Sequence, residues 1–87
     1  MDAQKLVAHN LKRMRLLKRV SQEDLAEDAG IARSYVWRLE KGEVNPTLDT
    51  MDRLAQALGG HVRDLLAQPQ VKEKPLKALP KGPKGPR

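Results

Sequence analysis

The residues best suited to contact a partner lie in the stretch IARSYVWRLEKG, at positions 31–42. It contains the only tyrosine, Tyr35, and the only tryptophan, Trp37, of a chain without phenylalanine, and Arg33 and Arg38 lie on either side. A small domain normally uses its aromatic rings in the core, because each ring buries a large apolar area. Guanidinium groups, in turn, make paired hydrogen bonds with planar acceptors such as O6 and N7 of guanine. The stretch therefore indicates a binding surface.

The elements that must position this surface read as helices. A first helix is predicted from apolar residues at i, i+4 and i+7, namely Val7, Leu11 and Met14. A second helix begins at Ser21, because the serine is followed three residues later by Asp24, as in a capping box. Gly30 ends this second helix, which is therefore short.

The remaining elements follow the same logic. A third helix is expected over about residues 32–40, with Gly42 ending it. Thr47 caps a fourth helix, which the pair Gly59-Gly60 breaks. A short fifth helix carries the apolar residues Val62, Leu65 and Leu66. Since no strand pattern or internal repeat occurs, the fold class is predicted to be all-α, a compact domain of five helices.

The charge of the chain is distributed unevenly. Residues 1–67 carry 11 Lys/Arg and 10 Asp/Glu, a net of +1, whereas residues 68–87 carry six Lys/Arg and one Glu, a net of +5. The second segment also holds five of the six prolines and few residues that build a core. We predict a folded domain over 1–67 and a disordered basic tail over 68–87. Such a tail is most often a solvated terminus, and the alternatives are that it adds non-specific affinity for nucleic acid or binds a protein partner.

Several classes of function are excluded by what the sequence lacks. Without cysteine there is no disulfide and no thiolate metal site, and His9 and His61 have no ligand partners at metal-binding spacing. No Ser/His/Asp or Cys/His set suggests catalysis, so neither an enzyme nor a cofactor is expected. The N-terminus has no signal-peptide pattern and no segment has membrane-spanning length, which predicts a cytoplasmic protein.

The second and third helices, joined by about three residues that include a glycine, form a helix-turn-helix pattern. Over a longer range, the segment SQEDLAEDAGIARSYVWRLEKGEVNPTLDTMDRLAQALGGHVRDLL resembles the lambda repressor/Cro-like (XRE) family of bacterial and phage DNA-binding domains. The resemblance runs from about Val7 to Leu66, and its most specific parts are SQEDLA, RSY with RLEKG, and NPTLDTMDRLAQALG. The segment RSYVWRLEKG is most similar to restriction–modification controller proteins or to plasmid and phage repressors.

This resemblance implies that the third helix enters the major groove of double-stranded DNA. With Val36 and Leu39 inward, the outward face carries the expected base-reading residues Arg33, Ser34, Trp37 and Arg38. The arginines suit guanine, Ser34 donates or accepts, and Trp37 suits a thymine methyl group or sugar carbons. The alternatives are solvated arginines and a tryptophan that folds back on the first or fourth helix or joins a dimer contact.

The resemblance also implies roles for residues around that helix. Gln22, next to the cap of the second helix, is expected to bind a phosphate at the helix N-terminus, and the hydroxyl of Tyr35 is expected to reach another. The alternatives are a glutamine that is only a polar residue at a helix start and a partly packed tyrosine with an incidental hydroxyl. Lys41 and Asn45 are expected to contact the DNA backbone from the following loop. Arg15 and Glu40 are expected to form a buried ion pair, the alternative being two exposed charges of little energetic worth.

Three positions depart from the family pattern. Ala32 stands where a serine or threonine usually caps the third helix, which costs about 1 kcal/mol. Arg19 occupies a position that is commonly glycine, so the turn between the first two helices is expected to differ. Gly60 replaces an apolar residue before the fifth helix and puts the docking of that helix in doubt.

The leading functional prediction is a sequence-specific transcriptional regulator, a repressor that is associated with the nucleoid. A domain of this size reads few base pairs, so specificity implies a homodimer on a two-fold operator. The resemblance places the dimer interface at Val62, Leu65 and Leu66, some of which belong to the core of one chain instead. The alternative function is an antitoxin or adaptor module that uses the same fold to hold a protein partner.

Overall fold

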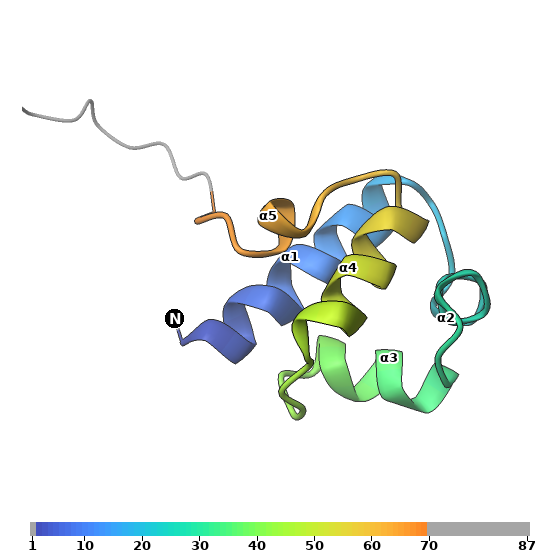
Figure 1. The fold of residues 1–87 in the computed structure, drawn as a ribbon, viewed down its shortest axis with the longest axis horizontal. Helices are drawn as coiled ribbons and strands as arrows, with labels where there is room; N and C mark the ends of the chain where they lie inside the picture. The colour runs from blue at the N-terminus through green and yellow to red at the C-terminus, as the bar shows by residue number, and fades with distance from the viewer. Residues whose placement is uncertain (1, 70–87) are drawn as a thin grey trace, which may run out of the picture.

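The computed structural model of the chain describes residues 2–69 (Figure 1). The predicted disordered tail lies outside these residues from position 70 onward, so the domain boundary near Ala67 stays a prediction. The regular elements are α1 (Ala3–Leu17), α2 (Gln22–Ala29), α3 (Arg33–Glu40), α4 (Leu48–Ala57) and α5 (Val62–Leu65). No strand occurs within residues 2–69, and the predicted all-α fold of five helices is confirmed.

Short polar residues start the helices where the sequence predicts them. The Ser21 hydroxyl accepts a hydrogen bond from the Asp24 backbone N–H at 3.0 Å, and the Thr47 hydroxyl accepts one from the Thr50 N–H at 3.0 Å. Each bond satisfies one of the N–H groups that a helix N-terminus leaves without an internal partner. Ala32 provides no such bond, as expected, so α3 starts without a side-chain cap.

The turn between α2 and α3 depends on Gly30, which adopts a left-handed conformation with φ of 73° and accommodates it without a Cβ penalty. Figure 1 shows α2 almost along its axis and α3 from the side, so the two helices cross steeply. The turn between α1 and α2 uses Arg19 at φ 57°, the one residue other than glycine with positive φ among the described residues. Arg19 therefore adopts the left-handed backbone conformation that glycine adopts most easily.

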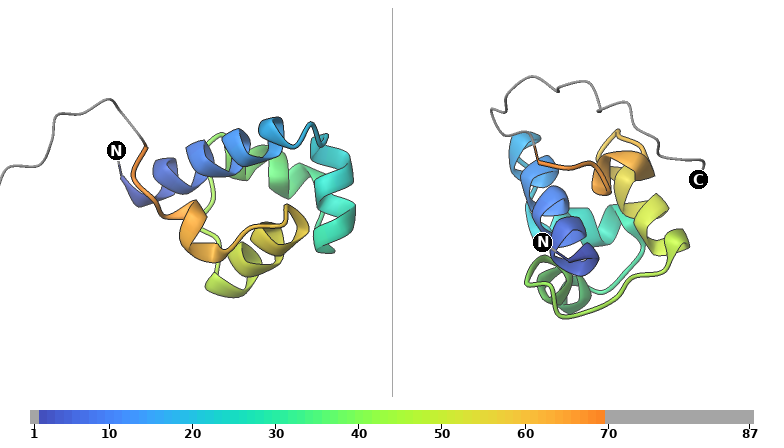
Figure 2. Two further views of the ribbon diagram at one scale, coloured as in Figure 1. Left: turned by 90° about the horizontal axis from the view of Figure 1, so that it is seen from above. Right: turned by 90° about the vertical axis from the view of Figure 1, so that its left-hand side faces the viewer.

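A single core holds these helices together. α2 packs on α3 and α4, α1 packs on α3 and α5, and α4 packs on α5 (Figure 2). The fully buried large side chains of this core come from every helix: Leu11, Leu25, Val36, Leu39, Leu54 and Leu65. Packing of this core, rather than intrinsic propensity, stabilises helices as short as α2 and α3.

The fifth helix docks firmly, which removes the doubt raised by Gly60. A Cβ at this position would lie 2.8 Å from Cε of Met14 and 3.1 Å from Oδ2 of Asp64, so a larger residue would require these two side chains to shift. Leu65 is fully buried beyond it, and Asn10 of α1 donates hydrogen bonds of 2.8 Å to the carbonyls of Leu65 and Ala67. Asn10 thus satisfies carbonyl groups that the end of α5 leaves free.

The start of α5 is held by a reciprocal cap that the sequence analysis missed. His61 Nδ1 accepts a hydrogen bond from the Arg63 N–H at 3.1 Å, while the Asp64 carboxylate accepts one from the His61 N–H at 2.8 Å. The spacing of His61 and Asp64 matches a capping box, with histidine in the place of the usual serine or threonine.

Candidate DNA interface

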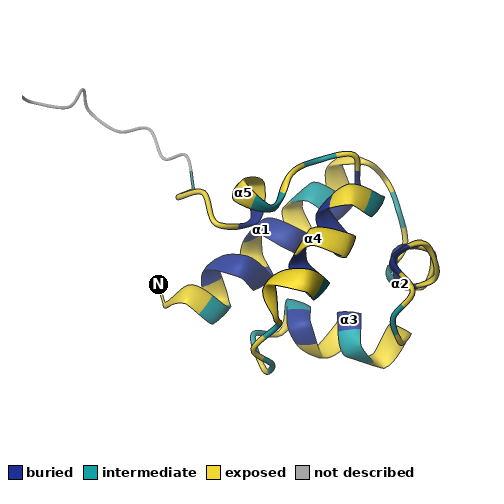
Figure 3. Cartoon of the chain, in the orientation of Figure 1, coloured by how far each residue is buried: buried dark blue, intermediate teal, exposed yellow. Residues whose placement is uncertain are grey.

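Helix α3 presents one buried face and one exposed face (Figure 3). Val36 and Leu39 have no exposed surface and fix the rotation of the helix about its axis. The outward face carries the residues expected to read bases, all of which are exposed: Arg33, Ser34, Trp37 and Arg38. None of these side chains contributes to the core, so the surface that they form is free to meet a ligand.

Trp37 is exposed over half of its surface and does not fold back on α1 or α4. The Nζ atom of Lys41 lies 4.2 Å from the centre of its ring, a cation–π geometry. Tyr35 differs, because its ring is partly buried and packs against the core. Of the two aromatic residues, only Trp37 therefore offers a ring face near the outward surface.

A hollow of about 650 Å³ separates the exposed face of α3 from the start of α2. Its lining combines the N-terminus of α2, at Ser21 and Gln22, with Ser34 and Trp37 of α3. Arg33 and Glu23 face each other across it with 3.7 Å between Nη1 and Oε1. Because both side chains are more than half exposed, this ion pair contributes little to stability and leaves Arg33 available.

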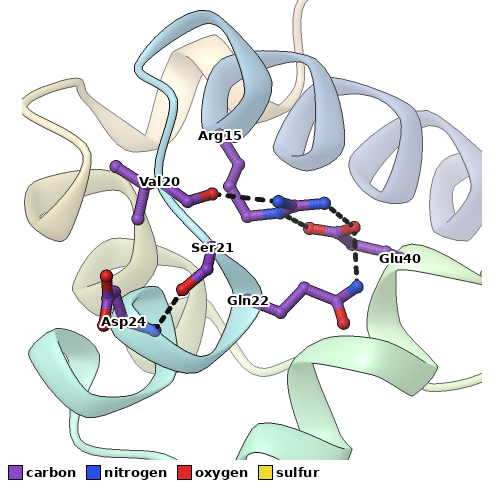
Figure 4. Close-up of polar contacts among 6 residues, drawn as sticks. All are labelled: Arg15, Val20, Ser21, Gln22, Asp24 and Glu40. Atoms are coloured by element: carbon purple, nitrogen blue, oxygen red, sulfur yellow. Dashed lines mark hydrogen bonds and ion pairs between the residues drawn. The ribbon is translucent and has the colours of Figure 1, made fainter.

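Arg15 and Gln22, which line this hollow, bind a buried carboxylate that joins α1, α2 and α3 (Figure 4). Nε and Nη2 of Arg15 donate to the two oxygens of Glu40 at 2.6 and 2.9 Å, a bidentate pair, and Nη1 donates to the Val20 carbonyl at 2.9 Å. The side chains of Arg15 and Glu40 are only 11% and 4% exposed. The hydrogen bonds and the charge of Glu40 raise the pKa of Arg15, against the opposite effect of burial, so the guanidinium is charged at neutral pH.

Gln22 belongs to the same network. Its Nε2 donates to Oε1 of Glu40 at 3.0 Å, which fixes the amide at the N-terminus of α2. Gln22, the predicted phosphate contact, and Arg15, a member of the predicted ion pair, therefore both donate to the Glu40 carboxylate. An amide has two N–H donors, so the bond to Glu40 leaves the second for a ligand.

The loop after α3 holds the last two residues expected to contact the DNA backbone. Lys41 and Asn45 are both exposed, and the Nζ atom of Lys41 lies 3.7 Å from the Glu43 carboxylate. Gln4 of α1 supports this loop, because its Nε2 donates to the Val44 carbonyl at 3.0 Å. The role of Gln4 was missed, since its partner lies 40 residues away and no local pattern marks it.

The residues assigned to a dimer interface do not form one surface. Leu65 is fully buried in the core of its own chain, so its assignment to an interface is corrected. Val62 is partly buried against the core, whereas Leu66 is 44% exposed. Leu66 borders a small cavity of about 140 Å³ together with Leu48, which is 71% exposed and which the sequence analysis did not assign to an interface.

Neither a membrane-spanning helix nor a metal-binding cluster is found in the described part of the chain. None of α1–α5 is long and apolar enough to cross a membrane. Over residues 2–69, no group of three or more His, Cys, Asp or Glu side chains is arranged to hold a metal ion.

Known proteins are similar to this chain in sequence and in fold. The HTH-type transcriptional regulator y4dJ of Sinorhizobium fredii is 44% identical over 59 residues, which cover 68% of this chain and 77% of that protein. The control protein C.SmaI of Serratia marcescens is 39% identical over 72 residues, 83% of this chain and 86% of that protein.

Among solved structures, the restriction-modification controller protein C.AhdI from Aeromonas hydrophila superposes with a TM-score of 0.69. It is 37% identical in sequence, and the match covers 71% of this chain and 94% of that one. The model of the helix-turn-helix family HTH_3 matches residues 11–65, from α1 to the last residue of α5. The resemblance predicted from the sequence is confirmed, and the chain belongs to the helix-turn-helix family HTH_3.

Proposed function

We propose that the protein is a sequence-specific DNA-binding regulator of transcription that inserts α3 into the major groove. The observation that carries the proposal is the outward face of α3, whose side chains are exposed and take no part in the core. In this arrangement Arg33 and Arg38 bind guanine edges, Ser34 adds a hydrogen bond, and Trp37 packs on a thymine methyl group or on sugar carbons. The family is a class of DNA-binding regulators rather than of enzymes.

The residues around α3 set the position of the domain on DNA. The free N–H of Gln22 and the backbone N–H groups at the start of α2 suit one phosphate, because a helix N-terminus favours negative charge. Lys41 and Asn45 suit phosphates on the far side of α3, and the hydroxyl of Tyr35 reaches another. These contacts hold the register of α3 without reading sequence.

We further propose that the regulator acts as a homodimer on a two-fold operator. A single α3 reads only a few base pairs, so two copies are needed for specificity. The exposed Leu66 and Leu48, which border one cavity, together with the outer edge of Val62, supply the apolar surface for this contact. A dimer that covers its operator excludes other proteins from the same DNA, and for this reason we assign repression.

Selection of bound DNA from a random pool tests the proposed function. Two-fold symmetric sequences are expected, with half-site centres about one helical turn of DNA apart, because each subunit places one α3 in the groove. The spacing would be read from the aligned selected sequences. A pool that stays random would contradict DNA reading and favour the alternative, an antitoxin or adaptor that binds a protein.

Replacing Arg33 or Arg38 with alanine is expected to weaken binding to the selected operator by about 1–3 kcal/mol each. Preference at one base pair per half-site is expected to relax, because the lost guanidinium bonds recognise particular acceptors. Fluorescence anisotropy with the operator, its single-base variants and random duplex measures both effects.

Two other variants serve as comparisons. Arg53→Ala removes an exposed arginine of α4 that pairs with Asp49, and it is expected to leave base preference unchanged. Gln22→Ala is expected to weaken binding to all DNA sequences to a similar degree. If the α3 variants lose operator and random DNA equally, Arg33 and Arg38 do not read bases.

A further inference from the structure

A second stripe runs along the outer face of α1, away from the core, and is exposed at every position except Ala8. Its residues follow the spacing i, i+3, i+4, i+7, i+8, i+11 and i+12, which keeps them on one side of a helix. They are Lys5, Ala8, His9, Lys12, Arg13, Leu16 and Leu17. The base-reading face of α3 uses none of them.

This stripe forms one side of a groove of about 610 Å³, and the C-terminal end of α3 with Lys41 and Gly42 forms the other. Ala8 is buried at 5% exposure without belonging to the core cluster, so its methyl group belongs to the floor of the groove. Leu16 and Leu17 are 55% and 71% exposed. Adjacent exposed leucines on a helix that already buries its opposite face indicate a surface that a partner covers.

The charged side chains of the groove that lack an ion-pair partner within residues 2–69 are basic. Within residues 2–69, Lys5, Lys12 and Arg13 form no ion pair. The only acidic residue that lines the groove is Glu40, and both of its carboxylate oxygens already accept from Arg15. A partner therefore meets apolar leucines beside unneutralised positive charges.

We infer that this α1 groove is a docking site for an acidic amphipathic helix of a partner protein, which goes beyond the proposed DNA binding. The twelve-residue distance from Lys5 to Leu17 corresponds to about 18 Å, or three helical turns. A helix laid along it covers Leu16 and Leu17 with its apolar side, while flanking Asp and Glu meet Lys5, Lys12 and Arg13. DNA phosphates would match the charges but not the leucines, since a phosphate backbone gains nothing from apolar contact.

The groove lies between α1 and the C-terminal end of α3, whereas the base-reading surface is the outward face of α3. They meet only near Lys41, whose ammonium also lies over Trp37. A partner helix in the groove therefore leaves Arg33, Ser34 and Arg38 uncovered. The regulator is able to hold DNA and an acidic protein segment together.

The test uses the full chain and a synthetic fluorescent peptide, a helix with leucines at i, i+4 and i+7 flanked by glutamates. Binding is measured by anisotropy, and the site is mapped by amide chemical shifts. We expect shifts at residues 5–17 and 40–42. The double variant Leu16→Ser/Leu17→Ser is expected to bind about tenfold more weakly or worse, because it removes most of the apolar contact. The reversals Lys12→Glu and Arg13→Glu are expected to weaken peptide binding similarly.

Matched controls separate this site from general charge and stickiness. Leu48→Ser removes a leucine with the same 71% exposure as Leu17 outside the groove, and because Leu48 belongs to the proposed dimer contact, its peptide affinity is compared per subunit. Arg63→Glu reverses a basic residue of α5. Both variants are expected to bind the peptide with the affinity of the natural protein. The groove variants, in turn, are expected to bind the operator with the affinity of the natural protein. Unchanged peptide binding by the double leucine variant, or shifts confined to α3, would overturn the inference. The inference would also be overturned if Lys12→Glu and Arg13→Glu weakened binding to random DNA and left binding to the peptide unchanged.

Discussion

Replacing Glu40 with alanine is expected to lower the free energy of unfolding by about 3–5 kcal/mol. The substitution leaves the guanidinium of Arg15, whose side chain is only 11% exposed, without the carboxylate that now accepts two of its hydrogen bonds. A buried charge without a partner costs far more than an exposed one. Chemical denaturation followed by circular dichroism measures the change.

Two comparisons show whether burial is the cause. Glu43→Ala removes a glutamate that is about half exposed, and it is expected to change stability by less than about 1 kcal/mol. Changing both members of the buried pair, as Arg15→Met/Glu40→Leu, is expected to recover much of the stability, since no uncompensated charge is left inside. Equal effects of Glu40→Ala and Glu43→Ala would show that the pair does not stabilise the fold.

Replacing Leu66 with glutamate is expected to give a folded monomer that binds the operator about 10²–10⁴-fold more weakly. Leu66 is 44% exposed in a single chain, so the new carboxylate stays hydrated in the monomer. In the proposed dimer the same group lies against its copy, where burial and like charge oppose association. Sedimentation velocity reports the oligomeric state, and anisotropy reports the affinity.

Leu17→Glu is the matched control, because it makes the same change at an exposed leucine on a different face of the domain. It is expected to leave the sedimentation coefficient unchanged. A natural protein that sediments as a monomer both free and on its operator would contradict the dimer proposal.

The helices could be predicted from the sequence because their ends follow from local chemistry. Ser21 and Thr47 cap α2 and α4 through backbone groups three residues away, and Gly30 ends α2 within one turn. The docking of α5 could not be predicted in this way. It depends on Asn10, whose partner carbonyl in Leu65 lies 55 residues away, and no local pattern records a contact over that separation.

In the candidate site, too, the features set by local spacing could be predicted and those set by distant contacts could not. Helical spacing alone separated the inward Val36 and Leu39 from the outward arginines. Spacing does not say which chain buries an apolar residue, and Leu65 was therefore assigned to an interface although it completes the core of its own domain. The bond from Gln22 to Glu40 was missed for a related reason, because several orientations of an amide suit a helix start.

The separation of the two faces of α3 also bears on how such a protein evolves. Substitutions at exposed positions usually change stability by less than about 0.5 kcal/mol. Since Val36, Leu39 and Glu40 hold α3 in place, mutations at Arg33, Ser34, Trp37 and Arg38 are nearly neutral for folding. Under the proposed function, a lineage carrying this domain would change from one operator to another by single mutations without passing through unfolded ancestors.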